Sequence, residues 1–222
     1  MALNNFWANF VALFIGTVSI TYAATTDGVG RYGVRVWDQF GEKLKPLKNL
    51  NDDGVWDEWV DRWVDLVLSH KSPDHKKIKS NYWMNEVIEI GEEKENEQFL
   101  NKAIPNITGD DKYKKENDDQ KKALAKKPEN KPFLLPKIEK LREECKYAYG
   151  KYINPDANPK ESWFKALEQK SKKSITDDEN YAYWKDVYIA CYNKWDKNNL
   201  PSLWMTKENK HLYLPKSKQK IN

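Results

Sequence analysis

The sequence predicts an all-α protein: a helical bundle preceded by an N-terminal hydrophobic helix. Apolar residues recur every three or four positions in several segments, helix-capping residues precede some of them, and no alternating pattern of strand length occurs. The 222 residues have room for one domain or for two small ones. Hydrophobic residues make up 39% of the chain, including 10 Trp and 12 Tyr, which is enough for a sizeable core.

The charged residues are numerous but nearly balanced. The chain has 38 basic and 34 acidic residues, a formal net charge of +4. Nucleic-acid-binding proteins usually gather positive charge on one face or segment, whereas here it is spread along the chain. We therefore expect no nucleic-acid partner.

Residues 1–26 carry no charged side chain, and within them residues 6–23 (FWANFVALFIGTVSITYA) are hydrophobic. This segment is slightly shorter than the roughly 20 residues that span a bilayer. Thr21-Tyr22-Ala23 fits a signal-peptide cleavage site, but residues 1–5 lack the usual Lys or Arg. We expect residues 1–26 to be a transmembrane anchor or a signal peptide. A helix buried in the protein's own core is the alternative.

Residues 27–50 are expected to form a juxtamembrane spacer that contains one short helix. Val34, Trp37, Phe40 and Leu44 recur at helical spacing, and Pro46 marks the expected end of the helix.

Residues 51–108 form a region rich in tryptophan that opens with an amphipathic helix. At about 100° per residue, one arc of this helix is entirely apolar and acidic residues lie opposite. The apolar arc consists of Trp56, Trp59, Val60, Trp63, Val64 and Val67. Residues 51–53 (Asn-Asp-Asp) offer oxygen atoms for the N-cap. The simplest interpretation is that the tryptophans face the core, and an exposed aromatic surface for a partner is the alternative.

One or two further helices are expected between residues 74 and 103, where apolar residues cluster around Trp83 and around Phe99. Asn106-Ile107-Thr108 then matches the N-glycosylation sequon, which matters only in a secretory pathway.

Residues 109–132 (GDDKYKKENDDQKKALAKKPENKP) are almost all charged or polar. Such a composition buries little apolar surface, so a mobile linker between two halves is expected, with partial helix allowed.

Residues 133–197 are expected to form a helical bundle. Pro136 suits the first turn of one helix, and Asn158-Pro159 the start of another. Residues 176–179 (Thr-Asp-Asp-Glu) match a capping box at the start of a third. Cys145 and Cys191 lie on apolar faces of the two outer helices, and in an exported protein we expect them to form a disulfide. Two reduced, buried thiols are the alternative.

Residues 198–222 form a tail that ends in polar, basic residues. Its segments LPSLWM and HLYLP contain enough apolar residues to pack back onto the bundle. If exposed aromatic residues bind a partner, Trp204 and Met205 are better candidates than the tryptophans around Trp56, because they lie outside any periodic face.

The sequence offers no set of residues that predicts catalysis. Gly28, Gly30 and Gly33 match the spacing of a dinucleotide fingerprint, but the strands that this fingerprint requires are missing. The chain has three histidines and no zinc-binding or nucleophile motif. We therefore expect no cofactor, no metal, no small-molecule substrate and no enzymatic activity.

The order of these segments resembles families of short proteins made by hemotropic mycoplasmas. The matching parts are FWANFVALFIGTVSITYAATTDGVGRYG, then VWDEWVDRW, then KLREECKYAYGKY and YWKDVYIACYNKW. A weaker resemblance, through the spacing W-x-x-W-x-x-x-W, is to tryptophan-rich antigens of malaria parasites. Both resemblances imply a helical surface or exported protein that faces a host, and neither implies catalytic residues.

Taken together, the sequence predicts a non-catalytic protein that is membrane-anchored with an extracellular domain, or secreted. Its expected role is host-facing binding or antigenic display, with the membrane and a host protein as partners. The alternative is an intracellular structural or adaptor protein whose N-terminal helix packs into its own core.

Overall fold

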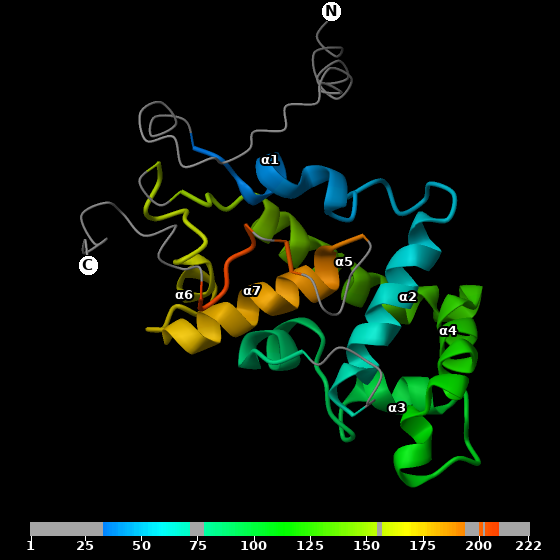
Figure 1. Cartoon of the computed structure of the whole chain (residues 1–222). Coiled ribbons are helices and arrows are strands. Elements are labelled where there is room, and N and C mark those ends of the chain that lie inside the picture. Colours follow the sequence, from blue (N-terminus) through cyan, green and yellow to red (C-terminus); the bar gives the residue numbers. More distant parts are fainter. Residues whose placement is uncertain (1–32, 72–77, 155–156, 194–199, 202, 209–222) are drawn as a thin grey trace, which may run out of the picture.

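The computed structural model describes residues 33–71, 78–154, 157–193, 200–201 and 203–208 (Figure 1). Within these ranges the regular elements are helices, and the β-structure is limited to three isolated bridges between single residues. The all-α prediction is therefore confirmed. The predicted hydrophobic helix at residues 6–23 lies outside the described residues. Among the helices that are described, none has the length and apolar character needed to cross a membrane.

Seven α-helices form the described fold: α1 (Val36–Phe40), α2 (Val55–Val67), α3 (Glu95–Asn101), α4 (Asp118–Lys126), α5 (Lys131–Tyr149), α6 (Ala166–Ser171) and α7 (Asp177–Cys191). Short 3₁₀ helices extend or connect them: η2 (Gly41–Lys43), η3 (Leu68–His70), η5 (Gly109–Tyr113), η6 (Lys115–Asn117) and η7 (Pro128–Asn130). The segment η4 (Trp83–Val87) is a π-helix.

The longest helix, α5, is the centre of the fold. It contacts α1, α2, α4, α7 and η4. Figure 1 shows α2, α3 and α4 gathered on one side of the molecule, with α6 and α7 on the other. A single cluster of buried apolar residues joins both sides, so the described residues share one core.

The tryptophans of α2 face this core, as the helical spacing predicts. Trp59 and Trp63 are 1% and 0% exposed, whereas Trp56 at the edge of the arc is only partly buried. The expected N-cap at residues 51–53 is wrong, because α2 begins after Gly54 at a φ of 72° with no side-chain cap. In α1, Phe40 is buried, whereas Trp37 is 45% exposed.

Residues 109–132 pack onto the other helices and do not form a linker between two halves, although the helical content allowed for them is confirmed. This segment contains η5, η6, α4 and η7, and α4 packs against α2 and α3. Lys122 and Lys126 of α4 form ion pairs with Asp65 and Asp61 of α2, at 2.7 and 2.8 Å. The charges that suggested a solvated linker are therefore complementary to the acidic face of α2.

The starts of α5 and α6 also differ from the expectation. Helix α5 begins at Lys131, so Pro136 lies inside it, and α6 begins at Ala166, well after Asn158. Thr176 caps α7 as predicted, since its Oγ1 accepts a hydrogen bond from the backbone N–H of Glu179 at 3.3 Å.

A candidate binding groove between η4 and the α6–α7 connection

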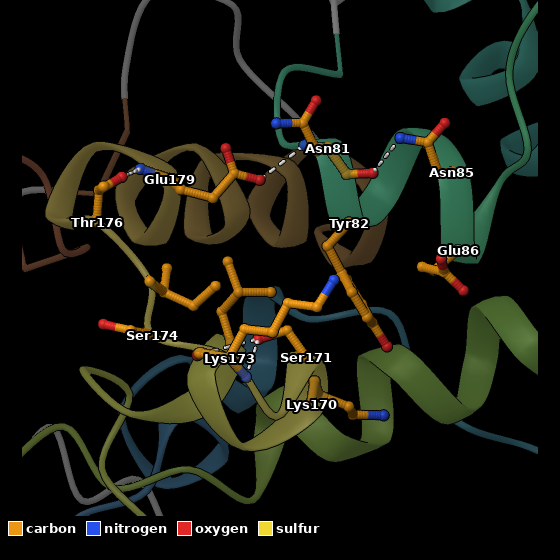
Figure 2. A pocket seen from close by; sticks show the side chains of 12 residues that line it. Asn81, Tyr82, Asn85, Glu86, Lys170, Ser171, Lys173, Ser174, Thr176 and Glu179 are labelled. Atoms are coloured by element: carbon orange, nitrogen blue, oxygen red, sulfur yellow. Dashed lines mark hydrogen bonds between the residues drawn. The ribbon is translucent and has the colours of Figure 1, made fainter.

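An open groove of about 720 Å³ lies between η4 and the connection from α6 to α7 (Figure 2). One wall is lined by Asn81, Tyr82, Asn85 and Glu86. Opposite them lie residues of the α6–α7 segment: Lys170, Ser171, Lys173, Ser174 and Thr176. Leu167 and Ile175 supply the aliphatic part of the lining, and Glu179 of α7 completes it.

The first wall is held in place by two carboxylates from α7. The backbone N–H groups of Lys79 and Ser80 donate to Asp186, at 3.0 and 2.7 Å. The backbone N–H of Asn81 donates to Glu179 at 2.7 Å. The free N–H groups at the start of a helical segment favour negative partners, so these carboxylates fix where the wall begins relative to α7.

The same wall has an unusual backbone. The segment η4 is a π-helix, a type of helix that is rare in proteins and is frequently found at functional sites. Glu89, just after η4, has a φ of 55°, a left-handed conformation that non-glycine residues seldom adopt. Strained residues of this kind persist where the surrounding structure holds them, and they often lie at binding sites.

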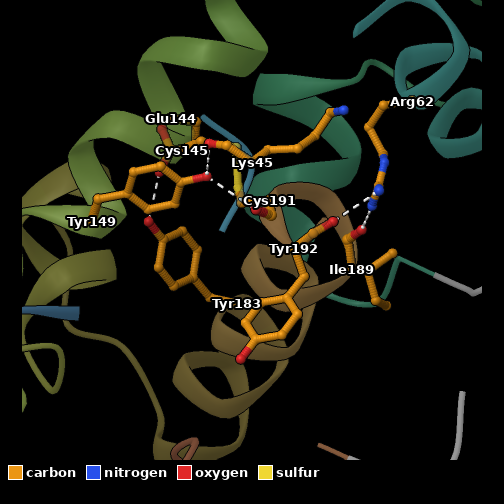
Figure 3. The surroundings of a disulfide bond; sticks show 9 residues. All are labelled: Lys45, Arg62, Glu144, Cys145, Tyr149, Tyr183, Ile189, Cys191 and Tyr192. Atoms are coloured by element: carbon orange, nitrogen blue, oxygen red, sulfur yellow. Dashed lines mark hydrogen bonds between the residues drawn. A yellow bond between two sulfur atoms is a disulfide. The ribbon is translucent and has the colours of Figure 1, made fainter. Parts of the chain in front are cut away.

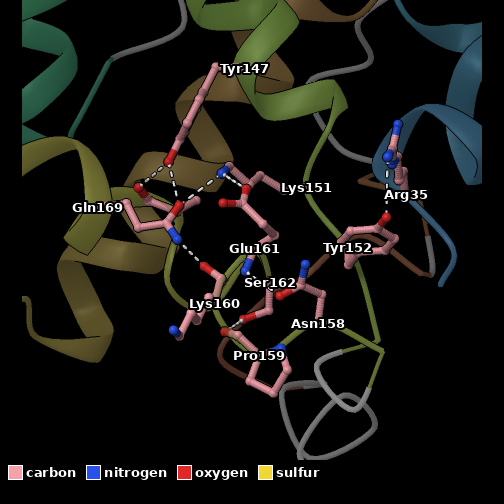
Figure 4. A network of polar contacts seen from close by, with 11 residues as sticks. Arg35, Tyr147, Lys151, Tyr152, Asn158, Pro159, Lys160, Glu161, Ser162 and Gln169 are labelled. Atoms are coloured by element: carbon pink, nitrogen blue, oxygen red, sulfur yellow. Dashed lines mark hydrogen bonds and ion pairs between the residues drawn. The ribbon is translucent and has the colours of Figure 1, made fainter.

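The second wall also contains a non-glycine residue in the left-handed conformation. Lys172 ends α6 with a φ of 54°, and the Ser171 hydroxyl accepts from the backbone N–H of Lys173 at 3.3 Å. Helix α6 is attached to α5 by a polar network (Figure 4), in which the Tyr147 hydroxyl bonds to the Ala166 carbonyl and to Gln169, at 2.9 and 3.0 Å. The Gln169 oxygen also accepts from Lys151 at 2.8 Å. The turn is therefore tied to the central helix.

Glu144 of α5 connects the two walls beneath the groove. Its carboxylate accepts from the hydroxyls of Tyr82 and Tyr183, at 3.1 and 2.6 Å, and pairs with Lys170 at 2.9 Å. Burial, reinforced by the negative charge of Glu144, raises the pKa of Tyr82 and of Tyr183 above the ordinary value for tyrosine. Both phenols therefore stay protonated and act as donors, and the Glu144 carboxylate neutralises the charge of Lys170.

Several groups in the groove are left for a ligand. The side chains of Asn81, Glu86, Lys173 and Ser174 are exposed and make no hydrogen bond or ion pair within the described part of the chain. They offer an amide, a carboxylate, an ammonium and a hydroxyl around the apolar lining. This set suits recognition by hydrogen bonds.

The structure brings together the two cysteines that the sequence singled out. Cys145 of α5 and Cys191 of α7 form a disulfide, with the sulfurs 2.05 Å apart (Figure 3). The Tyr149 hydroxyl lies between the carbonyl oxygens of Lys45 and Cys191, at 2.9 and 3.0 Å, and they share its single hydrogen. Both cysteines are fully buried. The bridge thus joins the helix that carries Glu144 to the helix that carries Glu179 and Asp186.

The predicted partner contact at Trp204 and Met205 is wrong, because these residues are 0% and 2% exposed. Trp204 donates from its indole nitrogen to the Trp184 carbonyl at 3.0 Å. It packs among the aromatic rings of Phe40, Trp163, Trp184, Tyr188 and Tyr192. Trp204 and Met205 of the segment LPSLWM therefore pack back onto the bundle, whereas HLYLP lies outside the described residues.

Sequence reasoning missed the groove. The one groove segment with a local sequence motif is the capping box at residues 176–179. That motif predicts the start of a helix, but not that the Glu179 carboxylate binds the Asn81 N–H of the opposite wall. No spacing in the sequence relates α7 to η4, so this contact depends on the tertiary fold.

The described residues contain no group of three or more His, Cys, Asp or Glu side chains placed to hold a metal ion. Comparison of the chain with protein-family models, with curated proteins and with solved structures gave no match.

Proposed function

We propose that this chain is a non-catalytic binding protein that acts outside the cytoplasm, anchored in a membrane or secreted through residues 6–23. The observation that carries the proposal is the buried disulfide between Cys145 and Cys191. Structural disulfides form and persist in oxidising compartments and are rare in the cytosol.

The N-terminal sequence supports the same location, because an uncharged stretch with an 18-residue hydrophobic segment is typical of anchors and signal peptides. A host-facing role also agrees with the resemblance to surface and exported helical proteins. Binding is favoured over catalysis because the groove offers hydrogen-bonding groups, while its one tyrosine, Tyr82, donates its hydroxyl to Glu144.

The test is the intact mass and thiol state of the protein recovered from its native cells. Membrane, soluble and secreted fractions are treated with a thiol-alkylating reagent, with and without prior reduction. We expect no alkylation before reduction and two alkylated cysteines after it. The mass should be full-length in the membrane fraction or should lack residues 1–23 in the secreted fraction.

A full-length, soluble protein with two free thiols would contradict the proposal. That result would favour an intracellular adaptor whose N-terminal segment packs into its own core.

A further inference from the structure

We propose that the groove between η4 and the α6–α7 connection binds an extended peptide segment of a partner protein, with one apolar side chain of the peptide against Ile175 and Tyr82. This inference rests on the proposed binding function and gives it a site and a ligand class.

The first argument is the arrangement of the two asparagines. A side-chain amide carries a donor and an acceptor, as a peptide group does, and so can pair with a peptide backbone through two hydrogen bonds. Asn81 and Asn85 are one helical turn apart, and Asn85 Nδ2 donates to the Asn81 carbonyl at 2.9 Å. One turn rises roughly 5–6 Å, and two residues of an extended chain span about 6.6 Å. The spacing of the two residues along the wall is therefore close to the two-residue repeat of an extended peptide.

The amides are also available for this role. The Asn81 side chain has no hydrogen-bond partner among the described residues, and Asn85 uses one of its two amide hydrogens. Their wall is fixed by Glu179 and Asp186, so a ligand finds its partners already in position.

The second argument is the apolar lining. Leu167 is 1% exposed and belongs to the core, while Ile175 and Tyr82 are partly buried and pack against that core. Ligand sites commonly combine such an apolar surface with a few polar groups that fix orientation. One apolar side chain of a peptide would gain from burial here, while its neighbours on either side remain at the polar rim.

The third argument is the balance of charge. Lys170 is neutralised by Glu144 at 2.9 Å, which leaves Lys173 as the free cation of the lining. The lining also holds two carboxylates, Glu86 and Glu179, and Glu179 accepts only a neutral backbone N–H. A phosphate or another anion would find a single free cation and two carboxylates. A peptide of mixed or no charge fits this groove better.

The experiment is panning of a random heptapeptide phage library on the full, disulfide-bonded protein, with the double variant Asn81→Ala/Asn85→Ala for counter-selection. We expect enriched peptides that share one apolar position. A synthetic copy of the best peptide, measured by titration calorimetry, should bind the double variant about tenfold more weakly, because two hydrogen-bonding side chains are lost.

A second variant and a matched control keep the test independent of folding. Ser174 is exposed, so Ser174→Trp fills the groove without disturbing the core and should abolish binding. The control Asn51→Ala/Asn106→Ala removes two exposed asparagines outside the groove and should bind as the wild type does.

Three results would overturn the inference. They are no enrichment on the wild type, binding that survives both groove variants, and groove-dependent binding of neutral oligosaccharides on a glycan array without peptide binding. A protein that is oxidised and exported but binds no peptide would contradict this inference alone, whereas free thiols in the native protein would contradict the proposed function.

Discussion

Glu144 is the residue on which both walls of the groove depend. Two tyrosine hydroxyls and the Lys170 ammonium converge on its buried carboxylate. Removal of a buried charged acceptor leaves its partners unsatisfied, which costs more than the loss of an exposed group.

We therefore expect Glu144→Ala to lower the free energy of unfolding by about 3 kcal/mol. The neighbouring residue Glu143, with its side chain 70% exposed, is a matched control on the same helix, and Glu143→Ala should cost less than about 0.5 kcal/mol. Urea unfolding followed by tryptophan fluorescence measures both. Equal costs for the two variants would contradict the role assigned to Glu144.

Asp186 gives the fold a dependence on pH. Burial raises its pKa from 3.8 to about 7, although the N–H groups of Lys79 and Ser80 oppose this shift. The folded state therefore binds more protons than the unfolded chain between these two pH values. It follows that the contribution of Asp186 to stability is complete below pH 3.8 and is lost as the pH rises toward about 7.

Asp186→Asn removes this titration but keeps an oxygen acceptor for Ser80. Between pH 4.5 and 7.5, the free energy of unfolding of the wild type should fall relative to that of the variant, by on the order of 3 kcal/mol. Urea titrations at four pH values would show this difference. Parallel pH profiles for the two proteins would count against a raised pKa in the folded state.

At the scale of elements, α2 and α4 show what the sequence predicts and what it does not. In α2, Trp59, Val60 and Trp63 recur at helical spacing, so the buried face follows from the sequence. In α4, the buried residues include Lys121 and Ala125, and no apolar stripe marks them. Its packing depends on the acidic face of α2, which local pattern analysis does not consider.

The same limit explains Trp204 and the groove. Trp204 lies outside any periodic face, so its burial depends on distant rings such as Trp163 and Trp184. The groove requires α7 to present Glu179 to Asn81, nearly a hundred residues earlier in the chain. The helices could be predicted from local spacing, whereas the contacts that shape the site could not.

Two alanines in α4 test whether this helix is packed or solvated. Ala125 is fully buried, whereas Ala123 is exposed. Ala125→Glu should lower the free energy of unfolding by about 3 kcal/mol, because a large charged group enters a packed site. Ala123→Glu should change it by less than about 0.5 kcal/mol. Thermal unfolding that is unaffected by either variant would restore the interpretation of a free linker.

At the scale of the whole molecule, the disulfide ties together the two helices that support the groove. Cys145 and Cys191 are 46 residues apart, and the loop that they close contains α6 and the whole second wall. In the chain-entropy model, closing a loop of this length stabilises the folded state by about 3–4 kcal/mol. The guanidinium of Arg62 connects α2 to the same end of α7, since it donates to the carbonyls of Ile189 and Tyr192.

We expect Cys145→Ala/Cys191→Ala to lower the free energy of unfolding by about 3–4 kcal/mol. A reductant should lower the stability of the wild type by a similar amount and leave the double variant unchanged, which separates the effect of the bridge from other effects of reduction. Urea unfolding at neutral pH, with and without reductant, measures all four conditions. A double variant within about 1 kcal/mol of the wild type would mean that the noncovalent contacts of Arg62 and Tyr149 suffice to join the two helices. In that case the disulfide would be dispensable for the fold, and its loss would leave both walls of the groove in place.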